Sequence, residues 1–325
     1  MNYIKVHQNK IMKGFVLLFL IAMLLFPAAS FQGASSGLLL WFHNVLPNLL
    51  PFIIISNLII RLNITQKLSK VFYPVLGRLL HISCEGCYPI VIGFLSGIPM
   101  GAKSTADLIA ENRIHKKEGQ FLFSMCNNAS PMFIIGYIAI TQLKLPHIKY
   151  ALFGIIYGSA ILSALIYRFF SNSFSKKDTN SSIAPVTSNN IKSSSKRFTF
   201  DILDSSIMNG FEIVTKIGGY IILFSILAQI IKEIGPDNGF FKAFFMGIFE
   251  ITTGINQVCN TNADINTKIV LVSVLTSFGG FSGVAQTKSV LGDSRLSMNS
   301  YIMVKLISAA ISLLLALLYV RYFRF

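Results

Sequence analysis

The sequence has few charged residues and a single tryptophan. Asp, Glu, Lys and Arg make up 13% of its 325 residues, whereas soluble domains carry about 25%. Hydrophobic residues make up 53%, and the mean hydropathy is +0.63. This composition excludes an ordinary soluble domain and is typical of a protein embedded in a lipid bilayer.

Cysteines and catalytic motifs are also sparse. Cys84 and Cys87 have the CxxC spacing of some zinc and redox sites, but no second pair and no pair of histidines accompanies them. We interpret them as small apolar residues near a helix end. No His-x-x-Glu-His, Gly-x-Ser-x-Gly or Walker sequence occurs. We therefore expect no enzymatic activity, no metal and no cofactor, and any transport would be facilitated or driven by ion gradients.

The charge that is present is mostly basic. There are 28 Lys and Arg against 13 Asp and Glu, which gives a formal net charge of +15. The basic residues lie mainly between apolar segments, as membrane topology requires. No nucleic-acid-binding fold or aromatic-basic motif occurs, so we expect membrane lipid, and no nucleic acid, as a partner.

Apolar segments recur along the whole chain, and about 20 residues suffice for one crossing of a bilayer. The sequence predicts an all-α polytopic membrane protein with about seven or eight membrane segments, some of them broken or re-entrant. The candidate segments are residues 1–30, 37–60, 121–143, 148–170, 217–234, 240–258, 267–291 and 301–320, and residues 89–119 hold a shorter apolar run with a polar return to the surface. We expect residues 1–30 to be an uncleaved N-terminal membrane helix, with a cleaved signal peptide as the alternative.

Polar stretches separate these segments. Residues 61–83 mix basic and apolar side chains and predict an amphipathic helix on the cytoplasmic surface. Residues 171–200 are rich in Ser, Asn and Lys without an apolar period, which indicates a cytoplasmic linker. The linker divides the chain into a first transmembrane half, 35–170, and a second half, 201–325. We expect residues 201–216 to be a surface segment.

Proline and glycine interrupt the first half. Pro47 and Pro51 lie one turn apart, and each proline removes a backbone hydrogen bond, so we expect a kink or local unwinding. Gly93, Gly97 and Gly101 recur at every fourth residue and predict a small-residue face for close helix contact.

Two further interruptions follow. Pro99 breaks the run 89–101, which is too short to cross comfortably, and this favours a re-entrant hairpin. In residues 121–143, four small or polar residues precede Pro131, a pattern that predicts the cap and first turn of a second half-helix.

The interruptions recur in the second half. Glu85 matches Glu250, and residues 96–104 match residues 279–287, in the same order and with about 18 extra residues in the second half. Paired Gly/Pro-interrupted segments at corresponding positions point to a transporter site. Chance similarity between apolar segments is the alternative to two related halves.

Two interrupted segments carry a lysine beside an unwound helix tip. Free backbone N–H groups and the helix dipole attract anions at such tips. We predict that the tips bind a carboxylated substrate, and the alternative is that the lysines only mark an interface. The candidates are Lys103, Ser104 and Thr105 at the first tip and Gln286, Thr287 and Lys288 at the second.

Polar residues within apolar segments are costly at membrane depth and point to function, with helix–helix hydrogen bonding as the alternative. The candidates for substrate binding are Asn127, Asn128 and Ser130. Glu250 lies within an apolar run and is the candidate coupling residue. It could carry a proton, bind a cation, or pair with Lys103 or Lys288. Glu85 is a weaker counterpart nearer the surface.

Three runs of the sequence resemble a known family. Residues 93–108, 126–136 and 249–254 read GFLSGIPMGAKSTADL, CNNASPMFIIG and FEITTG. They resemble the YlbJ family of sporulation integral membrane proteins, also called stage V sporulation protein V, within the wider group that has nucleoside-recognition gate domains. The resemblance runs from about residue 35 to the C-terminus. Residues 283–288 are also loosely similar to a hairpin motif of concentrative nucleoside transporters, in which an acid follows Gln-Thr. Lys288 stands at that place here, which argues against a nucleoside substrate.

The resemblance implies a role in endospore formation, in which dipicolinic acid moves from the mother cell across the outer forespore membrane. Dipicolinate is a planar aromatic dianion, which agrees with a site built from lysines and helix tips. We therefore expect a secondary transporter of a small organic anion. The alternatives are a nucleoside or nucleobase transporter and a non-transporting membrane organiser of spore assembly. A homo-oligomer is one alternative for the oligomeric state.

Overall fold

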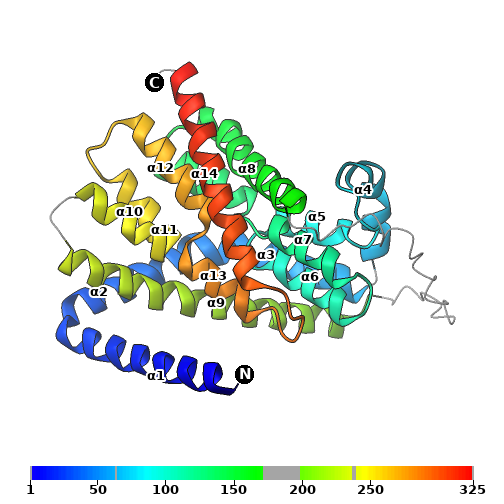
Figure 1. Ribbon diagram of the computed structural model, residues 1–325, viewed down its shortest axis with the longest axis horizontal. Coiled ribbons are helices and arrows are strands. Elements are labelled where there is room, and N and C mark those ends of the chain that lie inside the picture. The colour runs from blue at the N-terminus through cyan, green and yellow to red at the C-terminus, as the bar shows by residue number, and fades with distance from the viewer. Residues whose placement is uncertain (1, 63, 171–197, 236–238, 324–325) are drawn as a thin grey trace.

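Helices account for nearly all of the chain that the structure describes. The computed structural model describes residues 2–62, 64–170, 198–235 and 239–323, and within these ranges every regular element is a helix (Figure 1). The predicted all-α class is confirmed. The predicted linker lies outside the described residues over 171–197.

Four stretches are long and apolar enough to cross a bilayer. They are Pro146–Phe170, Phe200–Ile234, Ile265–Ser289 and Met298–Tyr322. A fifth candidate is the pair Lys13–Leu25 and Pro27–Val45, which bends by 105° at the break between its two parts. The chain is therefore an integral membrane protein with four or five candidate spans by length and composition. The seven or eight segments expected from the sequence are not confirmed, because several apolar runs form helices too short to cross.

The N-terminal quarter wraps around one long helix. α1 (Asn2–Leu25) ends at the bend, and α2 (Pro27–Leu40), the π-helix η1 (Trp41–Val45) and α3 (Leu46–Arg61) follow. α2 packs along α9 (Phe200–Ile234), where a Cβ on Gly33 would lie 2.7 Å from the Cα of Ile226. The distortion expected near the prolines appears as η1, directly before α3.

α9 is a single helix of 35 residues, where the sequence predicted a surface segment followed by a span from residue 217. Gly218 does not break it, because Trp41 of η1 covers this glycine. A Cβ on Gly218 would lie 2.6 Å from the Trp41 ring, and the Trp41 indole N–H donates to the Val214 carbonyl at 2.9 Å. A contact distant in sequence thus supports the helix across its glycines.

α4 (Thr65–Leu80) is the helix expected over residues 61–83, and it lies at one end of the molecule (Figure 1). Val71, Val75 and Leu79 are exposed along it, beside the exposed Lys67 and Lys70. The amphipathic helix is confirmed, and its place on a membrane surface stays a prediction.

Two short helical hairpins form the interior. α5 (Cys87–Ser96) and α6 (Met100–Ala110) make the first, and α10 (Gly239–Phe249) and α11 (Ile251–Cys259) make the second. In each hairpin two glycines bring the backbones into contact, Gly93 with Gly101 and Gly247 with Gly254. The hairpin expected at residues 89–119 is confirmed as a fold element. The apolar run 240–258, expected to be one segment, is a hairpin as well.

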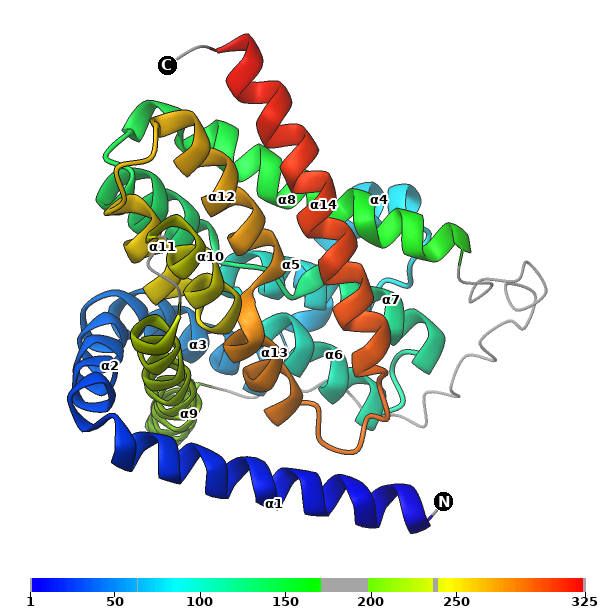
Figure 2. The same ribbon diagram turned by 60° about the vertical axis from the view of Figure 1, so that its left-hand side comes forward.

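Two interrupted helices lie beside the hairpins, and both views show α13 (Gly280–Ser289) between α11 of the second hairpin and α6 of the first (Figures 1 and 2). α7 (Lys116–Cys126) and the π-helix η2 (Phe133–Gln142) are separated by the polar residues predicted to break that segment. α12 (Ile265–Phe278) and α13 meet at Gly279, whose φ of +85° suits only glycine readily. The remaining elements are η3 (Pro146–Ile148), α8 (Lys149–Phe170) and α14 (Met298–Tyr322).

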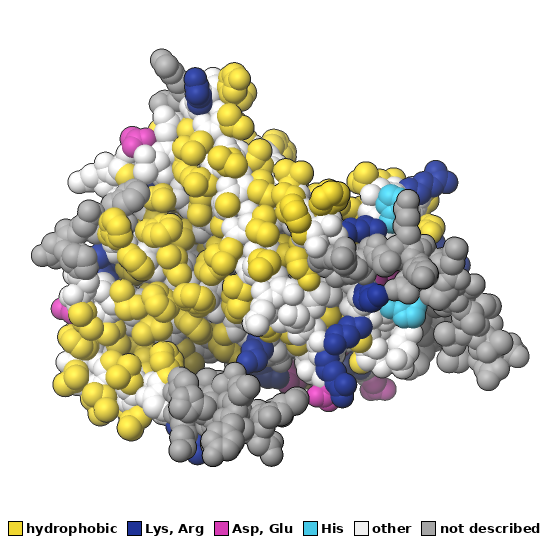
Figure 3. Space-filling view, in the orientation of Figure 1, with side chains coloured by type: hydrophobic (Ala, Val, Ile, Leu, Met, Phe, Trp, Pro, Cys, Tyr) yellow, Lys and Arg dark blue, Asp and Glu magenta, His cyan; other side chains and the backbone are white. Residues whose placement is uncertain are grey.

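The outer surface suits lipid. Figure 3 shows a broad apolar face over the upper and left parts of the molecule, with most of the charged side chains at its lower right margin. Exposed leucines of α8 and α14 contribute to the apolar surface, among them Leu162, Leu165, Leu306, Leu314, Leu317 and Leu318. Exposed apolar area on this scale marks an interaction surface, and for a chain with several apolar spans the partner is the bilayer.

Candidate functional site

The four helix breaks meet at one place. At the first hairpin tip, a Cβ on Gly97 would lie 2.7 Å from the backbone nitrogen of Ser130, which begins the second half of the α7–η2 segment. On its other side, Ile98 is 3.3 Å from a Cβ built on Gly279. A Cβ on Gly280 would in turn lie 3.3 Å from the nitrogen of Ile251, at the tip of the second hairpin. The two broken segments that the sequence singled out are therefore in contact.

A small cavity of about 70 Å³, here named the inner chamber, lies where the breaks meet. Its walls are mostly apolar, and every break contributes to them. The polar side chains that line it are Ser96, Ser130, Glu250, Thr252 and Gln286. Three of the predicted site residues, Ser130, Gln286 and Glu250, thus converge on one cavity although they come from different parts of the sequence.

Glu250 caps the second half of the second hairpin. It is 1% exposed, and its carboxylate accepts hydrogen bonds from the Thr253 backbone N–H at 2.6 Å and from the Thr252 hydroxyl at 3.2 Å. An acid at a helix N-terminus is stabilised by the free N–H groups and the dipole there. Among the described residues Glu250 forms no ion pair with a lysine, so of the three alternatives the pairing with Lys103 or Lys288 is not seen.

A second cavity, of about 180 Å³ and here named the outer cavity, lies between α6, α9 and α13. Lys103 on one wall pairs with Asp107 at 2.8 Å, and Lys216 on the opposite wall pairs with Glu212 at 2.6 Å. The two cavities share Ile217 and Gln286 in their linings, so they lie next to each other.

The other predicted residues of the two tips do not line either cavity. Ser104 and Thr105 are buried and donate to the Gly101 carbonyl within their own helix, at 3.2 and 2.8 Å. Thr287 donates to Gly283 O at 2.7 Å. Lys288 is exposed. α13 turns by about 100° per residue, so Lys288 faces almost opposite to the buried Gln286 two residues earlier.

The α7–η2 break carries a second polar cluster, next to the inner chamber. The Asn127 amide donates to the hydroxyls of Thr287 at 2.6 Å and Tyr301 at 2.8 Å. The side-chain amide oxygen of Asn128, Oδ1, accepts a hydrogen bond from Lys305 Nζ at 2.7 Å. The expected polar break is thus a junction that joins α7, α13 and α14.

Lys305 and Lys216 were missed by the sequence analysis. Lys305 is the one charged residue of the apolar run 301–320, and it follows Tyr301 and precedes Ser308 and Ser312 on the same helix face. That spacing was a usable signal. Lys216 follows Glu212 by one turn, which resembles an ordinary surface pair, and nothing local shows that the pair faces Lys103.

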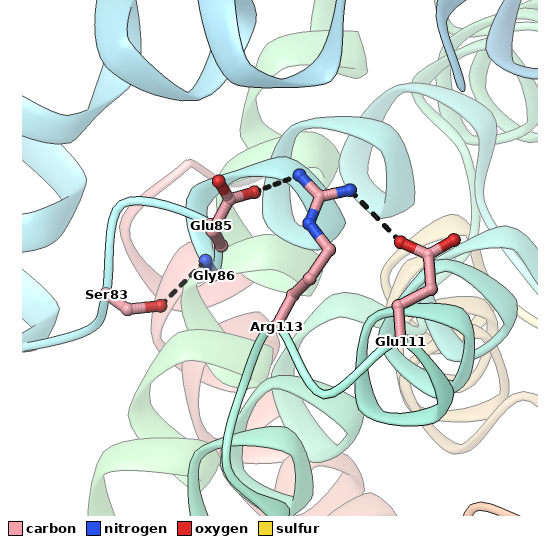
Figure 4. Close-up of polar contacts among 5 residues, drawn as sticks. All are labelled: Ser83, Glu85, Gly86, Glu111 and Arg113. Atoms are coloured by element: carbon pink, nitrogen blue, oxygen red, sulfur yellow. Dashed lines mark hydrogen bonds and ion pairs between the residues drawn. The ribbon is translucent and has the colours of Figure 1, made fainter. Parts of the chain in front are cut away.

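Glu85 lies away from both cavities, in the loop before the first hairpin. It forms an ion pair with Arg113, which also bonds Glu111 at 3.2 Å, while the Ser83 hydroxyl accepts from the Gly86 N–H at 3.1 Å (Figure 4). Glu85 and Glu250 therefore occupy different environments.

We expect this ion pair to contribute little to stability. The Glu85 and Arg113 side chains are each 27% exposed, and partly hydrated pairs contribute about 1 kcal/mol or less. A double-mutant cycle with Glu85→Gln and Arg113→Gln, read by thermal unfolding in detergent, should give a coupling energy of this size. A coupling above about 3 kcal/mol, as expected for a fully buried pair, would contradict this placement.

The cysteines show no special arrangement. Cys84, Cys87, Cys126 and Cys259 are free thiols, and burial raises the pKa of the Cys84 thiol. Within the described residues, no group of three or more His, Cys, Asp or Glu side chains is placed to hold a metal ion.

The fold and the site define the class as an all-helical membrane protein with broken helices that meet at a small cavity. Comparison with known proteins gives a relative of this chain. The chain is 27% identical over 311 residues to the sporulation integral membrane protein YlbJ of Bacillus subtilis (strain 168), covering 86% of this chain and 75% of that protein. This similarity supports the YlbJ family assignment that the motifs predicted. No protein-family model and no solved structure matches the chain.

Proposed function

We propose that this protein is a secondary transporter that moves a small organic anion, dipicolinate, from the mother cell toward the forespore across the outer forespore membrane during sporulation. The observation that carries the proposal is the meeting of four helix breaks on one small chamber with five polar side chains in its lining, beside a cavity lined by Lys103 and Lys216. The similarity to a sporulation integral membrane protein supports the biological setting.

The outer cavity suits weak and reversible binding of a dianion. Lys103 and Lys216 face each other across it, and Tyr220 and Ile213 provide apolar surface for a ring. Each lysine is paired with a carboxylate of its own helix, so these four groups carry no net charge. An anion binds by drawing the lysines from those carboxylates, and such binding is weak enough to release the substrate again.

The inner chamber holds the substrate only after opening. Its volume of about 70 Å³ is small beside the 300 Å³ or more of usual ligand pockets. In our proposal the hairpin tips move apart, and the freed N–H groups at the start of η2 and α13 face the carboxylates. Ser130 and Gln286 supply hydrogen bonds, and Gln286 lies on the boundary with the outer cavity.

Glu250 supplies the coupling in this proposal. A carboxylate that faces the chamber repels an anion at short range, and it ceases to do so when it carries a proton or a cation. The ion and the anion therefore enter the chamber together. No ATP-binding motif occurs in the sequence, so the gradient of that ion drives the transport.

The order of elements supports two related halves. A hairpin, an interrupted helix and a long span follow one another twice, as α5/α6, α7/η2 and α8 and again as α10/α11, α12/α13 and α14. This order pairs the first hairpin with the second. The sequence match paired residues 96–104 with 279–287, which lie in a hairpin and an interrupted helix. We propose that the repeat follows the order of elements.

The first test is ligand binding by the purified protein. Dipicolinate should raise the thermal unfolding temperature in detergent, whereas the monocarboxylate picolinate, uridine and adenosine should have little effect. In the Lys103→Met/Lys216→Met protein we expect the dipicolinate affinity to fall about tenfold or more, since two charge-assisted contacts are lost. Lys149→Met is the matched control, because Lys149 begins α8 and lines neither cavity.

The other outcomes favour other functions. Stabilisation by uridine or adenosine and not by dipicolinate would overturn the anion assignment in favour of a nucleoside transporter. No stabilisation by any of these compounds would favour a non-transporting membrane organiser.

A further inference from the structure

Lys305 of α14 is a buried basic side chain outside the linings of both cavities. It is 1% exposed and lies in a helix that is long and apolar enough to span a bilayer. Its Nζ donates one hydrogen bond, to the side-chain amide oxygen of Asn128 at 2.7 Å, and lies 5.8 Å from the centre of the Tyr301 ring. An ammonium group has three protons to donate, and the structure gives it one neutral acceptor.

No counter-charge accompanies Lys305. Within the described residues it forms no ion pair, and Tyr301 is the titratable side chain in contact with it. The other titratable side chains of α14 and of the helices packed against it, α7, α8 and α12, form no hydrogen bond or ion pair with it. They are Lys116, Lys117, Glu118 and Cys126 of α7, Lys149, Tyr150, Tyr157, Tyr167 and Arg168 of α8, Lys268 of α12, and Tyr319, Arg321 and Tyr322 of α14.

The polar cluster around Lys305 has an unused acceptor as well. The Asn127 carbonyl oxygen is buried and has no hydrogen-bond partner. Buried donors and acceptors that are left without hydrogen-bond partners are costly. Such a cluster is not optimised for stability alone, and its hydrogen bonds and protonation respond to a charge nearby.

The α7–η2 break connects Lys305 to the inner chamber. Asn128 holds the lysine, while the next two residues, Ala129 and Ser130, line the chamber. The path from Lys305 Nζ to the chamber wall crosses one hydrogen bond, the Asn128 side chain and one peptide unit of about 3.8 Å. Its length is on the order of 10 Å. The Tyr157 hydroxyl donates to the Ala129 carbonyl at 3.0 Å and holds the backbone between Asn128 and Ser130 in place.

We propose that Lys305 is a proton-binding site linked to the inner chamber, so that binding of an anion in the chamber is accompanied by uptake of a proton at Lys305 Nζ. This inference rests on the proposed function. The proton comes from the aqueous phase and adds to the lone pair of the neutral amine. The resulting ammonium group offsets one charge of the anion.

The physical reason is the absence of a counter-charge in the empty state. A buried ammonium without an anion is costly, so the empty protein favours the neutral amine. An anion about 10 Å away, at an effective dielectric constant of about 20, favours the charged form about tenfold per unit of charge. Linkage is reciprocal, so protonation of Lys305 strengthens anion binding by the same factor.

The sign of the pH dependence follows directly. Lys305 is charged at low pH and neutral at high pH, and the anion prefers the charged form. In Glu250→Gln, which removes the ionisable carboxylate that faces the chamber, dipicolinate affinity should therefore fall, by about tenfold or more, as the pH rises from 6 to 9, a range in which carboxylates with ordinary pKa values near 4 stay ionised. Lys305 acts through Asn128 and is a positioning and charge-compensating residue, without contact to the substrate.

The test is titration calorimetry of the full-length protein with dipicolinate, in buffers of different ionisation enthalpy, which counts the protons taken up per ligand. We expect the wild type to take up a proton. Lys305→Arg keeps a positive charge that is not released, so when it is added to Glu250→Gln the protein should bind tightly at every pH without this proton. Lys305→Met added to Glu250→Gln should bind about tenfold more weakly than Glu250→Gln alone at pH 6, and its affinity should not change with pH.

Glu250→Gln distinguishes the other buried ionisable group, because Glu250 faces the chamber. Proton uptake that persists in Glu250→Gln and is lost when Lys305→Arg or Lys305→Met is added to it supports the inference. Uptake that persists in both of these double variants, or a Glu250→Gln protein that binds dipicolinate without uptake, overturns it and leaves the proposed function standing. A wild type that does not bind dipicolinate overturns both.

Discussion

Replacing Gly101 by alanine should lower the thermal unfolding temperature by about 10 °C. The added Cβ would collide with the backbone carbonyl oxygen of Cys126, where the first hairpin packs against the end of α7. A backbone atom held inside a helix does not move aside at small cost. Overpacking of this kind costs about 3 kcal/mol, which corresponds to roughly 10 °C for a chain of a few hundred residues.

Gly154→Ala in α8 is the matched control, since no atom lies within 4 Å of a Cβ built there. Alanine is about 1 kcal/mol better than glycine within a helix, so this variant should unfold at the wild-type temperature or slightly above it. Size-exclusion chromatography of heated detergent-solubilised protein measures both. If Gly101→Ala were as stable as Gly154→Ala, the close packing of the first hairpin tip would be contradicted.

Replacing Glu250 should separate a structural role from a coupling role. Glu250→Ala removes the acceptor of the Thr253 N–H and leaves that group unpaired, at a cost of about 1 to 2 kcal/mol. Glu250→Gln keeps an acceptor oxygen and should remain within about 1 kcal/mol of the wild type. Its side chain no longer takes up a proton or carries a charge to hold a cation.

We therefore expect Glu250→Gln to lose concentrative uptake while it keeps exchange. In proteoliposomes under an imposed ion gradient, the accumulation ratio of labelled dipicolinate should fall to about one. Counterflow between preloaded and external dipicolinate needs no net ion movement and should continue. Accumulation at the wild-type level would remove Glu250 from the coupling mechanism.

The fold was predictable where the pattern is local. Gly93, Gly97 and Gly101 were expected to form one face for close contact, and the structure places all three against residues 126–130, although the face is built from two helices and the tip between them. The break before Pro131 was also local, because asparagine and serine favour helix caps. The length of α9 was not predictable, because it depends on Trp41, about 175 residues away along the chain.

Part of the candidate site was predictable for the same reason. Ser130 and Glu250 were recognised because each is polar within an apolar run, and Gln286 because it lies in an interrupted segment, and all three line the inner chamber. Lys288 was chosen by nearness in sequence, and the helical phase of α13 turns it outward. Lys216 reaches the outer cavity only because α9 and α6 pack together around it, and no local pattern encodes that contact.

The central claim is that an anion passes through this protein, and flux measures it most directly. Purified protein in liposomes would be tested for uptake of labelled dipicolinate without ATP, with liposomes containing the Lys103→Met/Lys216→Met protein in parallel. We predict saturable uptake by the wild type, inhibited by unlabelled dipicolinate and not by uridine, and reduced about tenfold or more in the double variant. Folded wild-type protein that gives no uptake above protein-free liposomes would contradict the account.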